Sequence, residues 1–256
     1  MQLELLVSCM NADIPKLIQK MNLQSAAIIV NQCDRYGVEQ IGNICTFHMD
    51  ERGVGLSRNH ALMRASKEII LFGDEDIEYV DGYEQLVIQE FEKYPKADGL
   101  LFEVDVDASR RTYHNDTFGR VGLLTCGRYP AYSMAFRTKK LRKAGTSFSL
   151  LFGGGAKYSN GEDSLFLRDC IKKGMKLYKT PVRLGVEVPR PSTWFTGYHE
   201  KFFVDRGVLF HFLYGNLAPV WAFRFAFFKR SEMCQDIPWK KAFAFILKGI
   251  KEGKNI

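Results

Sequence analysis

The sequence lacks several motifs that would point to well-known chemistry. Its six cysteines include no CxxC pair, and its five histidines show no spacing typical of a metal site. It has no phosphate-binding P-loop, no nucleophile-elbow motif, no internal repeat and no low-complexity segment. These absences argue against zinc, acyl-transfer and P-loop chemistry. The irregular cysteine spacing indicates reduced, buried thiols rather than disulfides.

The N-terminus also lacks the basic-then-apolar pattern of a secretory signal, because a strand-like run begins at residue 3. We therefore expect a cytoplasmic protein. A chain of 256 residues with 46% hydrophobic content can bury one sizeable core. The sequence predicts one α/β domain over residues 1–200 and a C-terminal helical extension over 201–256.

Positive charge is concentrated in that extension. Residues 201–256 carry ten basic and four acidic side chains, against a net charge of +7 for the whole chain. A basic, aromatic-rich surface suits anionic lipid headgroups, so we expect a possible peripheral contact with the inner face of the cytoplasmic membrane and no nucleic-acid partner. Residues 208–228 are just long enough to span a bilayer, but polar interruptions favour an in-plane or core-packed segment. The amphipathic run 239–251 suits a membrane interface or packing on the protein's own sheet, with neither favoured.

The first half of the chain alternates strands and helices. Residues 3–8 and 26–31 read as strands around a helix at 14–21, which is a βαβ unit. A strand at 44–48 and a helix at about 57–66 lead to a buried strand at 69–72. The pattern predicts a doubly wound, mostly parallel sheet with helices on both faces. The remaining expected elements are a helix at 83–91, a strand at 97–106, loops or a short hairpin at 107–130, a strand at 132–137, a helix opening at 160–163 and ending at 174, and strands at 176–180 and 185–188.

An acidic triplet follows the buried strand 69–72. Asp74 and Asp76 flank Glu75, at the kind of strand end where α/β sheets bind ligands. Two such carboxylates can ligate a divalent cation that clamps a diphosphate, whereas the simpler interpretation is an acidic turn with Glu75 facing solvent.

The triplet belongs to a longer pattern. An Arg-Asn pair at 58–59 precedes it, and Gly161, Glu162 and Asp163 open a helix about ninety residues later. In order and spacing, residues 3–185 resemble the family 2 glycosyltransferases, inverting enzymes of the GT-A fold. The resemblance implies a nucleotide-diphosphate sugar donor, with Mn²⁺ or Mg²⁺ held by Asp74 and Asp76, of which Asp76 is the more direct ligand. Arg58 would then lie near the donor phosphates; a solvated helix arginine is the alternative.

The same resemblance places the acceptor near the second acidic pair. Asp163 is the expected general base that takes the proton of the attacking hydroxyl, although acids also favour a helix N-terminus for capping alone. Glu162, Gly154, Gly155 and His199 are expected on the acceptor side. The glycines could equally serve only to turn the chain, and for His199 we favour an idle surface position.

Two segments depart from the family pattern where the nucleobase is read. Residues 8–11 stand where the family usually has Pro-Thr-Tyr-Asn, and residues 31–34 stand where many members have Asp-Asp-Gly-Ser. We expect Ser8 and Asp34 to contact the donor. Because both segments differ from the family pattern, the sequence gives little basis for choosing uridine over guanosine. The Gln-x-x-Arg-Trp signature of processive synthases is absent, which favours transfer of a single sugar.

The resulting hypothesis is a metal-dependent, inverting glycosyltransferase in cell-surface polysaccharide biosynthesis. It would move one sugar, from a UDP-sugar in preference, to a glycan acceptor, in particular a lipid-linked one. Two alternatives stay open. A sugar nucleotidyltransferase would also use paired aspartates on a metal but would release pyrophosphate, and a catalytically weak relative would bind a sugar nucleotide or a partner glycosyltransferase without turnover.

Overall fold

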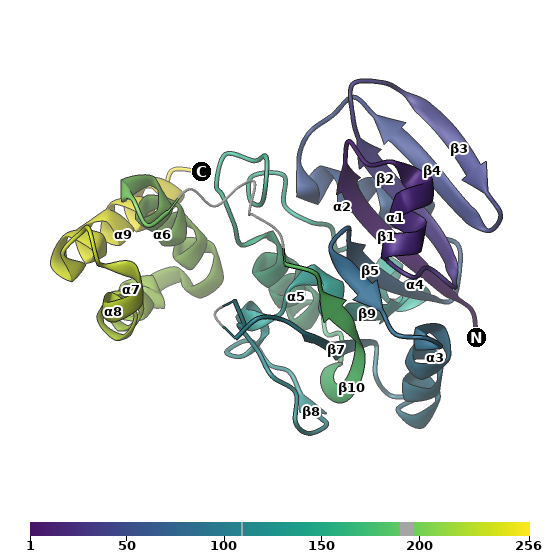
Figure 1. The fold of residues 1–256 in the computed structure, drawn as a ribbon. Helices are drawn as coiled ribbons and strands as arrows, with labels where there is room; N and C mark the ends of the chain where they lie inside the picture. The colour runs from purple at the N-terminus through teal and green to yellow at the C-terminus, as the bar shows by residue number, and fades with distance from the viewer. Residues whose placement is uncertain (109, 190–196) are drawn as a thin grey trace.

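The computed structural model describes residues 1–108, 110–189 and 197–256 (Figure 1). They form a ten-stranded mixed sheet in the order β3-β4-β2-β1-β5-β9-β7-β10-β6, with β8 paired to β10. The strands are β1 (Leu3–Met10), β2 (Ala26–Gln32), β3 (Gly37–Ile41), β4 (Ile44–Met49), β5 (Ile69–Asp74), β6 (Ile77–Tyr79), β7 (Gly99–Asp105), β8 (Gly119–Arg120), β9 (Met134–Arg137) and β10 (Leu177–Glu187). The helices are α1 (Ile14–Lys20), α2 (Val54–Arg64), α3 (Tyr83–Lys93), α4 (Thr138–Ala144), α5 (Glu162–Lys172), α6 (Glu200–Tyr214), α7 (Ala218–Phe228), α8 (Arg230–Met233) and α9 (Trp239–Gly253).

The N-terminal half of the sheet is parallel, as the alternation of strands and helices predicts. Strands β4, β2, β1 and β5 lie side by side in that order, so their carboxyl ends meet at one edge. The other half is mixed, because β9 runs antiparallel to both β5 and β7 while β10 runs parallel to β7. The α/β class and the mostly parallel strand direction are confirmed.

Several local predictions need correction. The edge strand β3, the three-residue strand β6 and the helix α4 have no counterpart among the expected elements. The two late strands are one strand, β10, whose register with β7 shifts between Lys179 and Gly185. Pro181 lies inside this irregular part, and because proline lacks a backbone N–H it interrupts the regular ladder without ending the strand.

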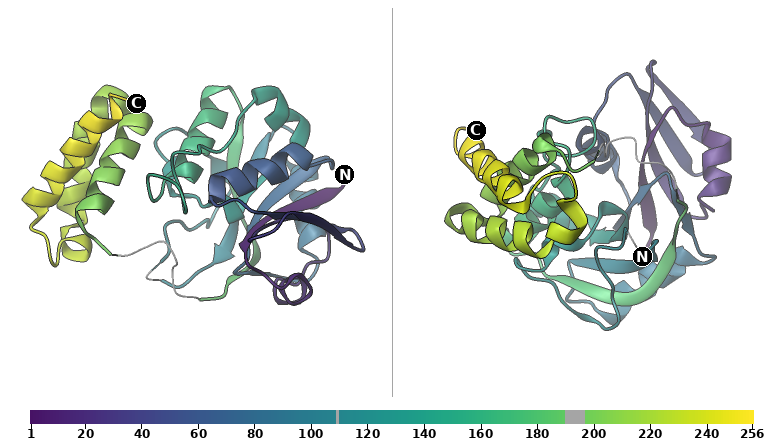
Figure 2. Two further views of the ribbon diagram at one scale, coloured as in Figure 1. Left: turned by 90° about the horizontal axis from the view of Figure 1, so that it is seen from above. Right: turned by 60° about the vertical axis from the view of Figure 1, so that its left-hand side comes forward.

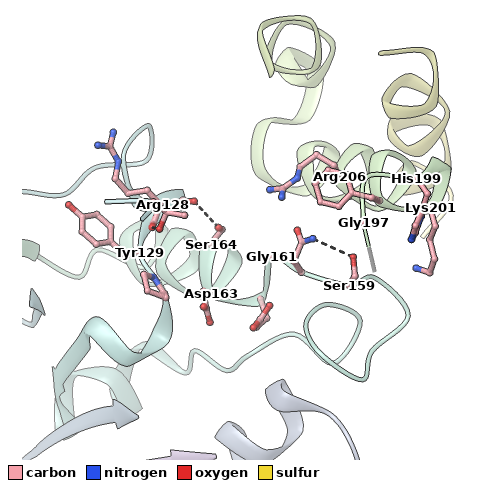
Figure 3. A pocket seen from close by; sticks show the side chains of 16 residues that line it. Arg128, Tyr129, Ser159, Gly161, Asp163, Ser164, Gly197, His199, Lys201 and Arg206 are labelled. Carbon is pink, nitrogen blue, oxygen red and sulfur yellow. Dashed lines mark hydrogen bonds between the residues drawn. The ribbon is translucent and has the colours of Figure 1, made fainter. Parts of the chain in front are cut away.

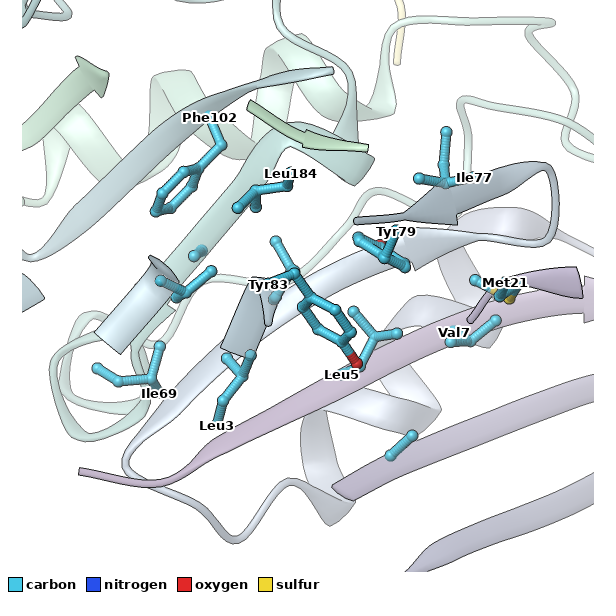
Figure 4. Close-up of a cluster of buried hydrophobic side chains, with 14 of the residues drawn as sticks. Leu3, Leu5, Val7, Met21, Ile69, Ile77, Tyr79, Tyr83, Phe102 and Leu184 are labelled. Atoms are coloured by element: carbon cyan, nitrogen blue, oxygen red, sulfur yellow. The ribbon is translucent and has the colours of Figure 1, made fainter. Parts of the chain in front are cut away.

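Alternating side chains of the central strands build two cores. In β1, Leu3, Leu5 and Val7 pack under α1 and α3 (Figure 4). Leu6 points to the opposite face, into a cluster with α2, α4 and α5 that contains Phe72 and Phe166. Helices therefore cover both faces, and both cores fix the ends of β1, β2 and β5 where ligands are expected.

The C-terminal helices form a separate group beside the sheet (Figure 2). Their own apolar cluster includes Phe203, Ala222, Ile246 and Ile250. Run 208–228 is not one segment, because α6 ends at Tyr214 and α7 begins at Ala218. Run 239–251 packs on α6 and α7 rather than on the sheet. Among the described residues, no helix has the length and apolar character needed to cross a membrane.

Close helix contacts hold this group in place. A Cβ on Gly207 would lie 2.1 Å from the backbone oxygen of Ile246, so α6 and α9 cross at a distance that only glycine allows. On its other side, α6 reaches the start of α5: a Cβ on Gly161 would lie 2.5 Å from Leu209, and Gly161 has φ +116°. The helical group thus packs directly against the residues that open α5.

Candidate active site

The carboxyl ends of the parallel strands place the donor-side residues together. Ser8 and Asp74 are register partners on β1 and β5. The Ser8 hydroxyl donates to the Ser57 hydroxyl of α2 at 2.8 Å, which ties this strand end to the helix that carries Arg58. Gln32, the last residue of β2, accepts a 2.8 Å hydrogen bond from the backbone N–H of Gly53, just before α2 begins.

Arg58 stands at the centre of the site. Its Nη2 donates to both carboxylate oxygens of Asp74, at 2.9 and 3.2 Å. Its Nη1 donates to Glu162 Oε1 at 3.1 Å and to Asp163 Oδ1 at 2.8 Å. One guanidinium therefore joins the end of β5 to the start of α5, and three carboxylates 16 to 105 residues away along the chain converge on it.

The surroundings of Arg58 keep it charged. Its side chain is 5% exposed, and its guanidinium carbon lies 5.4 Å from the centre of the Phe148 ring. Burial alone would lower the pKa of Arg58, but the carboxylates of Asp74, Asp163 and Glu162 outweigh it and raise the pKa. The charged guanidinium is thus a fixed part of the site.

Asp163 is the second residue of α5, and its carboxylate retains capacity to accept a proton. Oδ1 accepts from Arg58, and Oδ2 accepts from the backbone N–H of Ala131 at 3.0 Å. Each carboxylate oxygen can accept two hydrogen bonds, so one position on each remains for another donor. Burial raises the pKa of Asp163 to about 8; Arg58 opposes this rise, while Glu162 and Asp74 add to it. A carboxylate with a raised pKa is a stronger base than an ordinary aspartate.

Two cavities meet at these residues. A smaller one, of about 260 Å³, is lined by Ser8, Gln32, Arg58, Asp74 and Glu75 among others. A larger one, of about 650 Å³, lies between α5, the 127–130 segment and α6, and includes Asp163 (Figure 3). Residues common to both linings are Ser159, Asn160 and Glu162. The arrangement can hold two ligands, one in each cavity, with acidic side chains where they meet.

Comparison with known proteins decides the family. A model of glycosyl transferase family 2 matches residues 23–156, just over half of the chain. The chain belongs to glycosyl transferase family 2. A search of curated proteins finds no match.

Solved structures agree with this assignment at the level of the fold. The family 2 chain is similar to residues 1–349 of S. aureus TarS in complex with UDP-GlcNAc, with a TM-score of 0.66, 15% identity, and coverage of 98% of this chain and 82% of that one. The UDP complex of the same TarS fragment matches with a TM-score of 0.64 at 16% identity and the same coverages. At these identities the likeness shows the GT-A type of fold.

Most residues predicted for the site of this family 2 chain lie along the two cavities. Ser8, Arg58 and Asp74 line the smaller one, Asp163 and His199 line the larger, and Glu162 lines both. His199 is exposed and borders the larger cavity. Its role, like those of the others, stays a prediction.

Four predicted residues are placed differently. Asp34 is exposed and pairs with Arg52, outside both cavity linings. Asp76 is buried, and its backbone oxygen accepts a 2.7 Å hydrogen bond from Val188. Gly155 lines neither cavity, whereas Gly154 borders the smaller, donor-side one and accepts a 2.9 Å bond from the N–H of Val54.

Sequence reasoning missed Gln32, Glu75 and Arg206. Gln32 ends a parallel strand, so the expectation that ligands bind at the carboxyl ends of such strands, which identified Asp74, applies to Gln32 as well. Glu75 does not face away into solvent: it lines the smaller cavity, and its Oε2 accepts from the N–H of Met10 at 3.1 Å. Arg206, on α6, lines the larger cavity, and no pattern in the sequence identifies it.

The site offers few ligands for a metal ion. Within the described ranges, no three His, Cys, Asp or Glu side chains are arranged to hold one. Both oxygens of Asp74 already accept from Arg58. Mg²⁺ commonly binds through one or two carboxylates plus substrate phosphates and water. A cation here would be held largely by a bound diphosphate, and Asp74, which lines the smaller cavity, is the carboxylate that could ligate it.

Proposed function

We propose that this protein is an inverting glycosyltransferase that moves one sugar from a UDP-sugar to a glycan acceptor. The observation that carries the proposal is the position of Arg58, which joins Asp74 on the smaller cavity to Asp163 on the larger one. A donor in the smaller cavity and an acceptor in the larger one would meet at these carboxylates.

The donor assignment rests on the fold and on the smaller cavity. TarS, a similar structure, was crystallised with UDP-GlcNAc and with UDP. Here the ends of β1, β2 and β5 line the cavity, which is the edge where open α/β sheets bind nucleotides. UDP-GlcNAc is therefore the first donor to test.

The acceptor hydroxyl would be activated by Asp163. Inversion requires attack from the face opposite the leaving diphosphate, and Asp163 lines the cavity on the acceptor side while Arg58 and Asp74 face the donor. Its raised pKa suits it to take the hydroxyl proton as the new bond forms. Arg58 orients the carboxylate through its 2.8 Å hydrogen bond.

A divalent cation, Mn²⁺ or Mg²⁺, would bind with the donor. Asp74 would hold it, and Asp76 would do so only if its buried side chain turned toward the cavity. When bound, the cation stabilises the negative charge that develops on the leaving diphosphate. Arg58, beside Asp74, adds a second positive charge at the same place.

The acceptor is proposed to be lipid-linked, with the protein peripheral to the inner face of the cytoplasmic membrane. Exposed apolar side chains gather on α7 and just before it: Leu217, Val220, Phe223 and Phe228 are 49 to 70% exposed. Basic residues lie on α7 and on the elements that follow it, namely Arg224, Lys229, Arg230, Lys240 and Lys241. Exposed apolar side chains on helices that also carry basic residues suit a surface of anionic lipid.

The test is a donor screen that follows the reaction itself. The protein is incubated with Mn²⁺ or Mg²⁺, with UDP-, GDP- or dTDP-sugars and with a set of glycan acceptors, and the released nucleotide and the anomeric configuration of the product are measured by NMR. We expect UDP release and a β-linked product from an α-linked donor. Formation of UTP and a sugar 1-phosphate from the UDP-sugar when pyrophosphate is added, or retention of the α configuration, would contradict the proposal.

A further inference from the structure

Arg206 presents an unused charge to the larger cavity. It lies in the first half of α6, and Figure 3 shows its side chain extending from that helix into the pocket. Its guanidinium carbon lies 5.4 Å from the centre of the Phe202 ring and 5.3 Å from that of Phe225. Aromatic faces on two helices therefore fix the position of this arginine.

In the part of the chain that the structure describes, Arg206 has no acidic partner: no carboxylate there forms an ion pair with it, and its buried Nε has no hydrogen-bond acceptor. The nearby Lys201, by contrast, is neutralised by Asp205 at 2.6 Å. The Arg206 side chain is partly buried, and this burial lowers its pKa. Arginines drawn out of water are normally paired, because an uncompensated charge destabilises the fold.

The rest of the cavity places this charge away from the proposed base. Glu162 and Asp163, the acidic side chains of the lining, are both bound by Arg58. In Figure 3 the Asp163 carboxylate points away from α6, on which Arg206 stands. Arg128, exposed and also without an ion pair among the described residues, borders the same cavity. The acidic pair and Arg128 thus lie on the α5 side of the cavity, and Arg206 lies on the α6 side.

We propose that Arg206 binds an oxyanion of the acceptor, a phosphate or a carboxylate, and so selects acidic glycans. A planar guanidinium with several donors matches such a group in a two-point contact. The anion would supply the partner that the protein does not, while the reacting hydroxyl lies at Asp163. The identification of the ligand as the acceptor rests on the proposed function, whereas oxyanion binding at Arg206 can be measured without any transfer.

The test uses three small probes: inorganic phosphate, glucuronate and neutral glucose, at matched ionic strength. Their affinities are measured by ligand-observed NMR for the full-length protein, for Arg206→Met and for the control Arg64→Met. Arg64 also lies on an aromatic ring, that of Phe47 at 4.5 Å, but outside the cavity. We expect at least one anion to bind the wild type and Arg64→Met at least about tenfold more tightly than Arg206→Met. Stronger binding of phosphate indicates a phosphorylated acceptor, and stronger binding of glucuronate an acidic sugar.

Equal affinity of the anions for wild type and Arg206→Met, or no anion binding by the wild type, would overturn the proposal. Thermal unfolding without ligand supplies a second readout. A charged residue that serves a ligand lowers the stability of the free protein. Arg206→Met should therefore unfold at the same or a higher temperature than the wild type. If its unfolding temperature falls by several degrees, Arg206 is a structural residue and the assignment is contradicted. UDP binding by the wild type is measured in the same preparation, and its failure would count against the proposed function alone.

Discussion

Arg58 Nη1 lies 2.8 Å from Oδ1 of Asp163, although the two residues are 105 positions apart in the chain. The same guanidinium binds both oxygens of Asp74 through Nη2. A single buried cation therefore sets the distance between the residue proposed to meet the donor and the residue proposed to activate the acceptor. Because the carboxylates share one counter-charge, a change at any of them alters the others.

Transfer should depend on pH through Asp163. The active base is the deprotonated carboxylate, and burial raises its pKa to about 8. The rate should therefore rise about tenfold per unit as pH increases toward 8 and level off above it. Measurement of kcat/KM from pH 5.5 to 9.5 checks this. A profile that is flat between pH 6 and 9 would show that the ionisation of Asp163 does not limit transfer.

Arg58→Lys should displace that profile. An ammonium is a point charge and cannot hold Asp74 and Asp163 with the separate nitrogens that a guanidinium provides. Since Arg58 lowers the pKa of Asp163 against the effect of burial, weaker contact should raise that pKa further and move the profile to higher pH. Transfer at pH 7 should fall by about tenfold or more. An unmoved profile with merely lower protein stability would indicate a purely structural arginine.

Removal of divalent cations should weaken donor binding. Excess EDTA is expected to reduce UDP-GlcNAc affinity by at least about tenfold, because the diphosphate loses its main counter-charge. Asp74→Asn should reduce the response to added Mn²⁺, whereas Asp116→Asn, an exposed aspartate paired with Lys179, should not. Calorimetric titration of the donor with and without Mn²⁺ provides the measurement. Identical affinities in EDTA and Mn²⁺ would mean that Arg58 alone serves the diphosphate.

Membrane contact should depend on the aromatic residues of α7. The pair Phe223→Ser and Phe228→Ser removes two exposed rings and should lower binding to phosphatidylglycerol vesicles by at least about tenfold. The matched pair Met63→Ser and Val38→Ser, also exposed but on α2 and β3, should leave it unchanged. Co-sedimentation at low and high salt is the assay, with weaker binding expected at high salt. Equal recovery of both double variants would remove the support for this surface.

Deletion of residues 239–256 would be a less useful test of membrane contact. It would remove Ile246 and Ile250, which are buried against α6 and α7. The helical group would lose its core, so reduced membrane recovery would have two explanations. Surface substitutions avoid this ambiguity.

The sequence was sufficient for the parallel half of the fold because its strands are buried on both faces and read as unbroken apolar runs. Strand 69–72 and the acidic residues after it are an example. It was insufficient for β3, whose residues are mostly exposed, and for β6, which has only three residues. Such strands are defined by their partners, β4 and β10, and carry little periodicity of their own.

The site follows the same division. The sequence identifies Asp74 as a candidate by its position at a strand end and Asp163 by its position at a helix start. The sequence alone could not show that Arg58 connects them, because this role depends on simultaneous contacts with β5 and α5. Arg206 carries no sequence pattern, since its significance is the absence of a partner among the described residues around it.

The central claim is that Asp163 is the base of the transfer reaction, and Asp163→Asn tests it most directly. Asparagine keeps the size of the side chain but cannot take the proton, so the variant should bind UDP-GlcNAc as the wild type does and transfer its sugar about 100- to 10,000-fold more slowly. Asp169→Asn, at a half-exposed aspartate on the same helix, is the control. The decisive quantity is the single-turnover rate with saturating donor and acceptor: loss in Asp163→Asn alone is expected, and a rate equal to wild type would contradict the account.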